Sequence, residues 1–427
     1  MKKELILLVR KALDNSIDDK YIENLIKEYP ELEINGASFV TYYFNNELRG
    51  CIGTLTAYQP LYLDIINNAK LAAFSDHRFN PMIEEEFNKI DIEISILSEP
   101  VKVEYTSKGN LKEQISISDG IILEYQNKRA TYLPSVWESI PDFDSFFISL
   151  GEKANIEEDI FKIHPNIFKY QVKKYSETIR NMNVVDSFYP SKKKELYKYF
   201  NVLNFSDIKP RALIVPHAGY MYSSKTADKA YSYIKGKEYK RVIVIGPSHH
   251  YSFKNISGSF FDYYDTPLGK LKIDSKYLNR LNEKFNLSFL KEAHLLEHST
   301  ETQMPFIKNY LDIPVIELIY NQEENLTELI SYLLKDKNNL LVISSDLSHF
   351  LPLQEANRVD MNCFNGIKDI NLELLEQCDA CGINGIKSLL VNVKELNLKT
   401  RVLEYRTSFE TTGDESSVVG YLSAIIY

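Results

Sequence analysis

The chain has 427 residues, which corresponds to about three domains, or two large ones, at roughly 150 residues per domain. Hydrophobic residues make up 44% of it and charged residues 26%, a balance that excludes disordered, fibrous and disulfide-rich proteins. Acidic residues outnumber basic ones by 59 to 50, for a net charge of -9. The chain as a whole therefore has no electrostatic attraction for nucleic acid or an anionic membrane.

The N-terminal segment lacks the features of a secretory signal. Its apolar run, 5–9, is too short for the core of a signal peptide, and no small-residue cleavage site follows. No apolar run approaches the length of a membrane span. Only four cysteines occur, three of them between Cys363 and Cys381, which favours a reducing compartment over a secreted disulfide scaffold. We therefore expect a cytoplasmic protein without membrane or nucleic-acid partners.

The first part of the chain combines helices with strands that pair locally. Its patterns predict two helices, two hairpins and one half-buried strand. In chain order these are helix 4–13, hairpin 39–44 with 48–55 around Asn45-Asn46-Glu47, helix 61–74, strand 90–97, and hairpin 120–125 with 130–133. Such an order predicts an α+β domain, residues 1–180, in which helices pack on a mixed sheet.

The chain changes character near residue 180, and we expect a boundary at about 180–186. Beyond it come short continuous apolar runs, the type expected of strands buried on both faces. The runs are 212–215, 242–245, 315–319 and 340–343, with helical patterns at 226–234 and 326–334 and two further strands at 401–409 and 417–427. Strands separated by helices predict an α/β domain at 186–427.

Histidine follows three of these predicted strands. His217 comes after 212–215, His249 after 242–245 and His349 after 340–343, and a fourth polar segment contains His298. Because ligands bind at the carboxyl ends of strands in open α/β sheets, we expect these rings to meet. Imidazole is both a common metal ligand and a proton carrier, so the pattern predicts a joint metal or acid–base site. The alternative is that each histidine merely caps its own loop.

The second part also contains a single Cys-x-x-Cys motif, Cys378 to Cys381. A structural zinc site needs a second ligand pair, and a thioredoxin-like motif needs a strand directly before it; the sequence shows neither. We expect Cys363 and Cys378 to be buried small residues at a helix start. Cys381, before Gly382, is the stronger functional candidate because a helix N-terminus lowers the pKa of a thiol.

In the first part, Gly50 and Gly53 flank Cys51 within a predicted strand. Glycines there weaken the strand and permit close backbone approach. The segment could frame a reactive thiol at Cys51, with Arg49 beside it. The alternative, which we favour, is a bulge with a buried cysteine.

At these motifs the chain resembles two known families. Residues 186–427 resemble the Memo family, named for mediator of ErbB2-driven cell motility, through Ser187-Phe188-Tyr189-Pro190, Pro216-His217-Ala218-Gly219-Tyr220, Gly246-Pro247-Ser248-His249-His250, Glu297-His298-Ser299, Ser344-Ser345-Asp346 with His349, and Cys381-Gly382. Residues 1–180 resemble the AMMECR family through Leu48-Arg49-Gly50-Cys51-Ile52-Gly53-Thr54, Ala72-Ala73-Phe74-Ser75-Asp76 with Arg78-Phe79, Ser95-Ile96-Leu97-Ser98-Glu99-Pro100, and Ala130-Thr131-Tyr132-Leu133-Pro134. In prokaryotes these families neighbour a radical S-adenosylmethionine protein, the AmmeMemoRadiSam set, so the resemblance implies a fusion of two components and the third as a separate partner.

The resemblance to the Memo family implies the fold of class II non-haem iron extradiol dioxygenases. It implies His217, His249 and Cys381 as metal ligands, with His298, Asp346 and His349 as acid–base or supporting groups in the same pocket. True dioxygenases use two histidines and a carboxylate, whereas this ligand set contains a thiolate. Two imidazoles with sulfur suit iron or copper, and zinc is a further candidate. Ring cleavage therefore does not follow from the resemblance.

Two functions of different classes are compatible with these features. The first is a metal-dependent redox or oxygenase-like enzyme acting on a small molecule, with an aromatic compound as one candidate. In it, His298 or His349 would move a proton, held in its tautomer by Asp346. The alternative is a non-catalytic module whose imidazoles bind a phosphorylated or anionic ligand. The AMMECR-like part is expected to serve as a partner or substrate-delivery domain.

Overall fold

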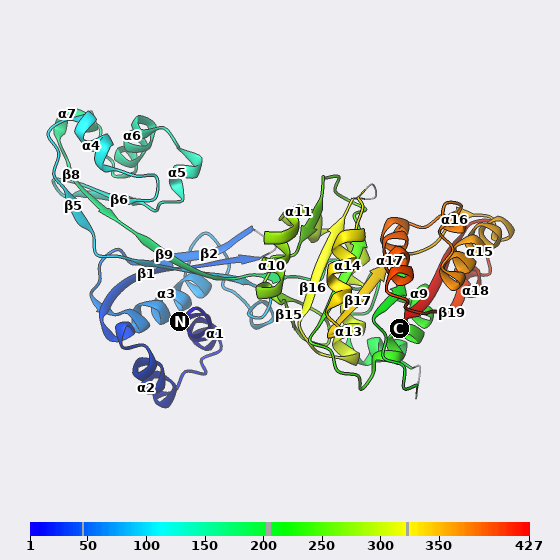
Figure 1. Ribbon diagram of the computed structural model, residues 1–427. Coiled ribbons are helices and arrows are strands. Elements are labelled where there is room, and N and C mark those ends of the chain that lie inside the picture. Colours follow the sequence, from blue (N-terminus) through cyan, green and yellow to red (C-terminus); the bar gives the residue numbers. More distant parts are fainter. Residues whose placement is uncertain (45–46, 202–205, 322–323) are drawn as a thin grey trace. The chain divides into compact units, whose positions relative to one another are not determined.

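The computed structural model describes residues 1–44, 47–201, 206–321 and 324–427 (Figure 1). The chain divides into two compact units, Met1–Thr178 and Ile179–Tyr427. Within the described ranges, no helix combines the length and the apolar character needed to cross a membrane. Two residues of the first expected turn, Asn45 and Asn46, lie outside the described residues.

The first unit contains two antiparallel sheets with helices packed on them. One sheet has the order β2-β1-β4-β9, with β3 paired to β1, and the other has the order β5-β8-β6-β7. Its strands are β1 (Asn35–Phe44), β2 (Glu47–Gly53), β3 (Gln59–Pro60), β4 (Asp91–Leu97), β5 (Val101–Val103), β6 (Gly120–Tyr125), β7 (Lys128–Tyr132), β8 (Asn166–Tyr170) and β9 (Val172–Glu177). Its helices are α1 (Lys2–Leu13), α2 (Asp19–Glu28), α3 (Leu61–Phe74), α4 (Lys108–Gln114), α5 (Val136–Ser139), α6 (Phe143–Lys153) and α7 (Ile160–Ile163).

The predicted elements of this unit are present, and its α+β class is confirmed. Helix α3 has the expected bounds, and both hairpins form, as β1 with β2 and β6 with β7. The expectation of one mixed sheet is wrong, because every described strand pair of the unit is antiparallel and the strands form two sheets. Each sheet has its own core, one against α1 and α3 and one against α6. The hairpins supply one strand pair of each sheet, and strands distant in the chain supply the others, such as β4 with β9 and β5 with β8.

The second unit is built on an eight-stranded sheet with the order β13-β16-β12-β17-β11-β20-β18, in which β19 also pairs with β20. The four central strands are parallel, and the strands outside them pair antiparallel. The strands of the unit are β10 (Ile179–Arg180), β11 (Ala212–Val215), β12 (Arg241–Pro247), β13 (Ile256–Gly258), β14 (Tyr263–Tyr264), β15 (Leu271–Lys272), β16 (Val315–Tyr320), β17 (Asn339–Ser344), β18 (His349–Leu351), β19 (Thr400–Thr407) and β20 (Val418–Ile426).

Helices cover this sheet and complete an α/β fold, as predicted. They are α8 (Lys193–Leu196), α9 (Tyr220–Tyr231), α10 (Ser275–Phe285), α11 (Lys291–Leu295), α12 (His298–Glu301), α13 (Met304–Tyr310), α14 (Thr327–Lys335), α15 (Leu353–Asp369), α16 (Leu372–Leu375), α17 (Ile383–Glu395) and α18 (Phe409–Thr412). Helix α9 packs on β11 and against α13, whereas α14 packs against α17 and on β17 (Figure 1). The central strands are fully buried, which explains their continuous apolar runs.

Candidate metal centre

Three neighbouring parallel strands end at the same edge of the sheet of the second unit. Strand β17 pairs with β11 on one side and with β12 on the other. His217 follows β11, His249 follows β12 and Asp346 follows β17. The expected gathering of polar side chains at the carboxyl edge is therefore observed, since parallel strands present these ends together.

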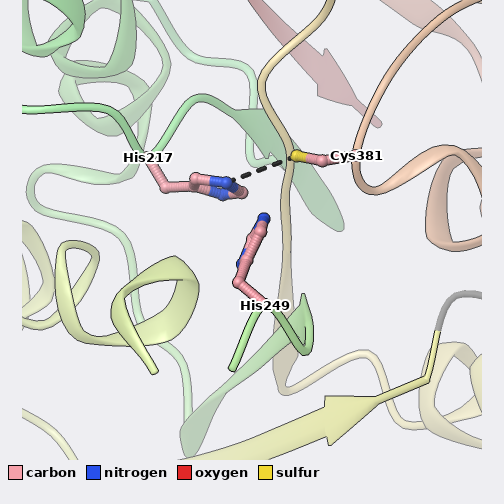
Figure 2. A group of neighbouring side chains, drawn as sticks. All are labelled: His217, His249 and Cys381. Carbon is pink, nitrogen blue, oxygen red and sulfur yellow. Dashed lines mark hydrogen bonds between the residues drawn. The ribbon is translucent and has the colours of Figure 1, made fainter. Parts of the chain in front are cut away.

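The side chains of His217, His249 and Cys381 converge at this edge (Figure 2). One potential ligand atom from each lies within 4.8 Å of the other two. His217 Nε2 is 3.3 Å from Cys381 Sγ, and the rings of His217 and His249 are 5.2 Å apart between centroids. Two imidazole nitrogens and one sulfur at this separation suit a transition metal of borderline or soft character.

The His249 ring is oriented by Glu297, a fully buried carboxylate. His249 Nδ1 lies 2.8 Å from Glu297 Oε1, and the backbone N–H of His249 donates to Oε2 at 2.6 Å. Burial raises the pKa of Glu297, but the hydrogen bonds and charge interaction with His249, together with the hydrogen bond from Ser299, lower it by more, to about 2. A carboxylate that accepts from Nδ1 leaves Nε2 of the ring for a metal, as in many protein metal sites.

A second group of potential ligands consists of His249, Glu297 and His298, whose atoms also lie within 4.8 Å of one another. Glu297 is already engaged, because Oε1 accepts from Ser299 N at 2.9 Å in addition to His249. His298 Nδ1 is 3.6 Å from the same oxygen. We therefore interpret Glu297 as support for the histidines. The donor atoms that fit a metal are those of His217, His249 and Cys381.

Cys381 reaches this group through a close approach of its loop to the end of β17. A Cβ at Gly382 would lie 2.6 Å from Ser345 Cβ, and Gly382 N donates to Ser345 Oγ at 2.9 Å. The thiol accepts a hydrogen bond from Asp346 N at 3.3 Å. The expectation of a lowered thiol pKa is wrong: burial raises the pKa of Cys381 well above its usual range. The helix dipole is outweighed because the thiol is removed from water.

His298 and His349 both lie near this group, on different elements. His298 opens α12, with its ring centroid 5.4 Å from that of His217 and 4.5 Å from that of His249. It packs on Phe188 at 4.9 Å. His349 begins β18, next to the exposed Phe350. Burial raises the pKa of Asp346, and the hydrogen bond from the His217 backbone and the charge interaction with His349 oppose part of this effect.

Asp346 does not have the contacts that the sequence suggested. Its Oδ1 accepts hydrogen bonds from the backbone of His217 at 2.8 Å and of Ala218 at 3.4 Å. Its Oδ2 lies 3.9 Å from His217 Nε2. The expected hydrogen bond to His298 or His349 is not formed among the described residues. Asp346 instead fixes the backbone that carries His217.

Comparison with known proteins identifies both units. A family model described as Memo-like protein matches residues 180–425, and one described as AMMECR1 matches residues 6–175. The chain belongs to the Memo-like protein family. The first unit of this Memo-like protein corresponds to the AMMECR1 model, so the expected combination of two families in one chain is confirmed.

Proteins similar to parts of this chain occur in bacteria and archaea. A MEMO1 family protein of Aquifex aeolicus is 35% identical over 265 residues, covering 58% of this chain and 98% of that protein. One of Sulfolobus acidocaldarius is 32% identical over 281 residues, covering 57% of this chain and 98% of that protein. A solved structure of an uncharacterized protein from Pyrococcus horikoshii is 26% identical, with a TM-score of 0.34, and covers 40% of this chain and 89% of that chain.

The remaining cysteines of the Memo-like unit do not behave as expected. Cys363 and Cys378 form a disulfide, whereas the sequence suggested only buried small residues at a helix start. Cys363 lies inside α15, and Cys378 lies between α16 and α17, three residues before Cys381. No local pattern indicates this pair, because partners 15 residues apart meet only through the packing of α15 against α16.

In the AMMECR1 unit, Cys51 is a free, partly buried cysteine whose side chain interacts with the guanidinium of Arg78. The Cys51 thiol contacts Thr41 Oγ1 at 3.1 Å, and Arg49 forms an ion pair with Glu86 at 2.8 Å and donates to Asn80 O. Within the residues that the structure describes, no imidazole or carboxylate bonds to the thiol. The close backbone approach expected at the glycines is observed, since a Cβ at Gly50 would lie 2.2 Å from Ala72 O.

A buried constellation of Ser257, His294 and Glu317 was not predicted from the sequence. Ser257 Oγ is 2.9 Å from His294 Nε2, and His294 Nδ1 is 2.8 Å from Glu317 Oε2. This order of contacts is that of a hydrolase triad. All three side chains have no exposed surface, and Ser257 Oγ also accepts from Leu290 N. We interpret them as a structural network that links β13, α11 and β16.

Proposed function

We propose that the Memo-like unit is a metal-dependent redox or oxygenase-like enzyme acting on a small molecule, with an aromatic compound as the first candidate. The metal would be held by His217, His249 and Cys381. The observation that carries this proposal is the convergence of two imidazole nitrogens and one sulfur within 4.8 Å. Iron, copper and zinc are the candidate metals, since this ligand set suits all three.

The side chains around the ligands support a chemical role. A bound transition metal would supply Lewis-acid activation of a substrate oxygen or electron exchange with it. His298, which is not needed as a ligand, presents its ring 5.4 Å from that of His217. Because His298 Nδ1 lies toward Glu297, its Nε2 is the atom that would accept a substrate proton. Asp346 would keep the His217 backbone in place during this step.

The alternative, a binding module for phosphorylated or anionic ligands, has less support. Glu297, whose pKa is lowered, is a buried carboxylate beside the histidines. Glu297 would repel an anion placed beside it, because charges interact strongly away from water. The burial of His217 and of His298 lowers the pKa of both rings, to about 3 for His298, so these rings are neutral near pH 7.

The proposal is tested by elemental analysis of the full chain, purified once in air and once without oxygen. We expect about one transition metal per chain, bound most tightly in the anaerobic sample if it is copper(I) or iron(II). The double variant His217→Ala with Cys381→Ala should lose it, whereas Cys51→Ala in the other unit should retain it. Metal content unchanged in the double variant would refute the site.

A further inference from the structure

The hydroxyl group of Ser344, the last residue of β17, has three polar neighbours. Ser344 Oγ lies 2.6 Å from Ser299 O, 2.9 Å from Gln303 Nε2 and 3.0 Å from His217 Nδ1. Ser344, Ser299 and Gln303 have no exposed surface. A hydroxyl offers one hydrogen and two lone pairs, so these three contacts use its full capacity.

The orientation of the Gln303 amide follows from its other contacts. Gln303 Nε2 lies 2.9 Å from Pro216 O, a carbonyl that can only accept, so the NH₂ group must point there. The opposite oxygen, Oε1, accepts from the hydroxyl of Tyr231 at 3.0 Å. If the amide were flipped, Gln303 Oε1 would face Pro216 O, and two acceptors would meet without a hydrogen. The NH₂ group therefore donates to both Pro216 O and Ser344 Oγ.

The direction of the Ser344 hydrogen follows in turn. Ser299 O can only accept, so the single hydroxyl hydrogen of Ser344 is directed to it. One lone pair takes the hydrogen bond from Gln303, which leaves the other for His217 Nδ1. A lone pair requires a donor, so the hydrogen of the His217 ring must reside on Nδ1. Its Nε2 is then bare and faces Cys381 Sγ at 3.3 Å.

We propose that Ser344 is a positioning residue for the metal centre, holding His217 in the tautomer that leaves Nε2 ready to bind, with Gln303 and Ser299 fixing the direction of the hydroxyl. The inference deepens the proposed function and rests on it for its consequence, but the tautomer exists before any metal binds. It also means that Ser299 and Gln303, on or next to α12, support His217, whereas Glu297 at the start of the same helix supports His249.

The tautomer is measured directly in the metal-free full chain. Histidine labelled with 15N gives separate long-range 1H–15N correlations for protonated and bare ring nitrogens, and the His217→Ala spectrum identifies the signals of His217. We expect Nδ1 protonated and Nε2 bare at neutral pH. A spectrum with the hydrogen on Nε2, or on both nitrogens, would overturn the proposal.

The effect of Ser344 on the His217 tautomer and on metal binding is measured with Ser344→Ala and a matched control. Ser344→Ala should give a mixture of His217 tautomers and weaken Co²⁺ or Zn²⁺ binding by about 10- to 100-fold, the usual effect of losing such a supporting group. Ser423→Ala removes another fully buried serine hydroxyl, one without a hydrogen-bond partner among the described residues, and should change neither property. An unchanged tautomer together with unchanged affinity in Ser344→Ala would contradict the proposal.

Gln303→Met tests whether Gln303 helps to orient the Ser344 hydroxyl. It should weaken metal binding by less than Ser344→Ala does, because Ser299 O still takes the hydroxyl hydrogen. The matched control is Asn392→Leu, which removes an equally buried amide that donates to Thr327 O and Ser388 O near the far end of α17.

The wild-type measurements distinguish the two proposals. If the wild-type chain binds no metal yet shows the expected tautomer, the proposed function fails and the role of Ser344 in setting the tautomer stands. If it binds metal but shows the opposite tautomer, the proposed function stands and the role of Ser344 fails.

Discussion

Glu297 accepts hydrogen bonds from the backbone and from the ring of the same residue, His249, at 2.6 and 2.8 Å. This double contact fixes both the position of the loop after β12 and the rotation of the ring. The carboxylate is therefore the counterpart, for His249, of the Ser344 hydroxyl for His217.

Replacing this carboxylate should weaken metal binding. In Glu297→Gln the amide must present either its oxygen or its NH₂ group to each donor, so one of the two contacts to His249 is lost. We expect metal affinity to fall by about 10- to 100-fold and the unit to lose about 1–3 kcal/mol of stability. Competition against a chromophoric chelator measures the affinity. Glu404→Gln, which alters a partly exposed ion pair with Lys229, is the matched control and should bind as the wild type does.

The disulfide of the Memo-like unit should stabilise it. Cys363 and Cys378 are 15 residues apart, and closing a loop of this length contributes about 3 kcal/mol. Cys378→Ser should therefore lower the free energy of unfolding and increase hydrogen exchange in α15, whereas Cys51→Ser should not. Thiol counting on the denatured, unreduced chain should find two free thiols, those of Cys51 and Cys381. Four free thiols would show that the disulfide is absent.

The stability of the AMMECR1 unit should depend on pH through Asp76. Hydrogen bonds from the Arg78 side chain lower the pKa of Asp76 well below its usual range, although burial opposes them. Because the folded pKa lies below the unfolded value of about 3.9, this stabilisation is complete above about pH 4 to 5 and is lost as the pH falls toward the folded pKa.

The substitution Asp76→Asn should remove that dependence. We expect a loss of about 2 kcal/mol at neutral pH, and a difference from the wild type that shrinks on acidification to about pH 3. Urea unfolding followed by the fluorescence of Trp137, the single tryptophan of the chain and buried in this unit, measures it. A difference that stayed constant with pH would mean that the carboxyl is not held in its charged form by Arg78.

The close contact of Gly50 with α3 should not tolerate a side chain. A methyl group there would lie 2.2 Å from Ala72 O, a backbone atom that cannot move alone. Gly50→Ala should destabilise the AMMECR1 unit by about 1–3 kcal/mol or more, again measured through Trp137. Gly109→Ala in α4, where the nearest atom is 3.9 Å away, should be neutral or stabilising. Equal effects of the two substitutions would argue against steric conflict as the cause.

The amino-acid sequence alone determined the elements and the edge of the sheet where the histidines gather. The continuous apolar runs of β11, β12 and β17 predict buried parallel strands, and the polar residues that follow them predict the edge at which His217 and His249 meet. These signals are local, since burial on both faces constrains every residue of a strand. The hairpins of the first unit could also be predicted from the sequence, because turn residues separate two strand-forming runs in each.

Only the tertiary structure decided which side chains support the histidines and how the cysteines divide their roles. Glu297 and Ser344 lie 48 and 127 positions from the histidines they orient, and Gln303 lies 41 positions from Ser344. The Cys363–Cys378 disulfide and the raised pKa of Cys381 likewise depend on packing and burial. A hydrogen bond between distant residues carries no local pattern, because its energy depends on three-dimensional proximity and the exclusion of water, which only the folded chain provides.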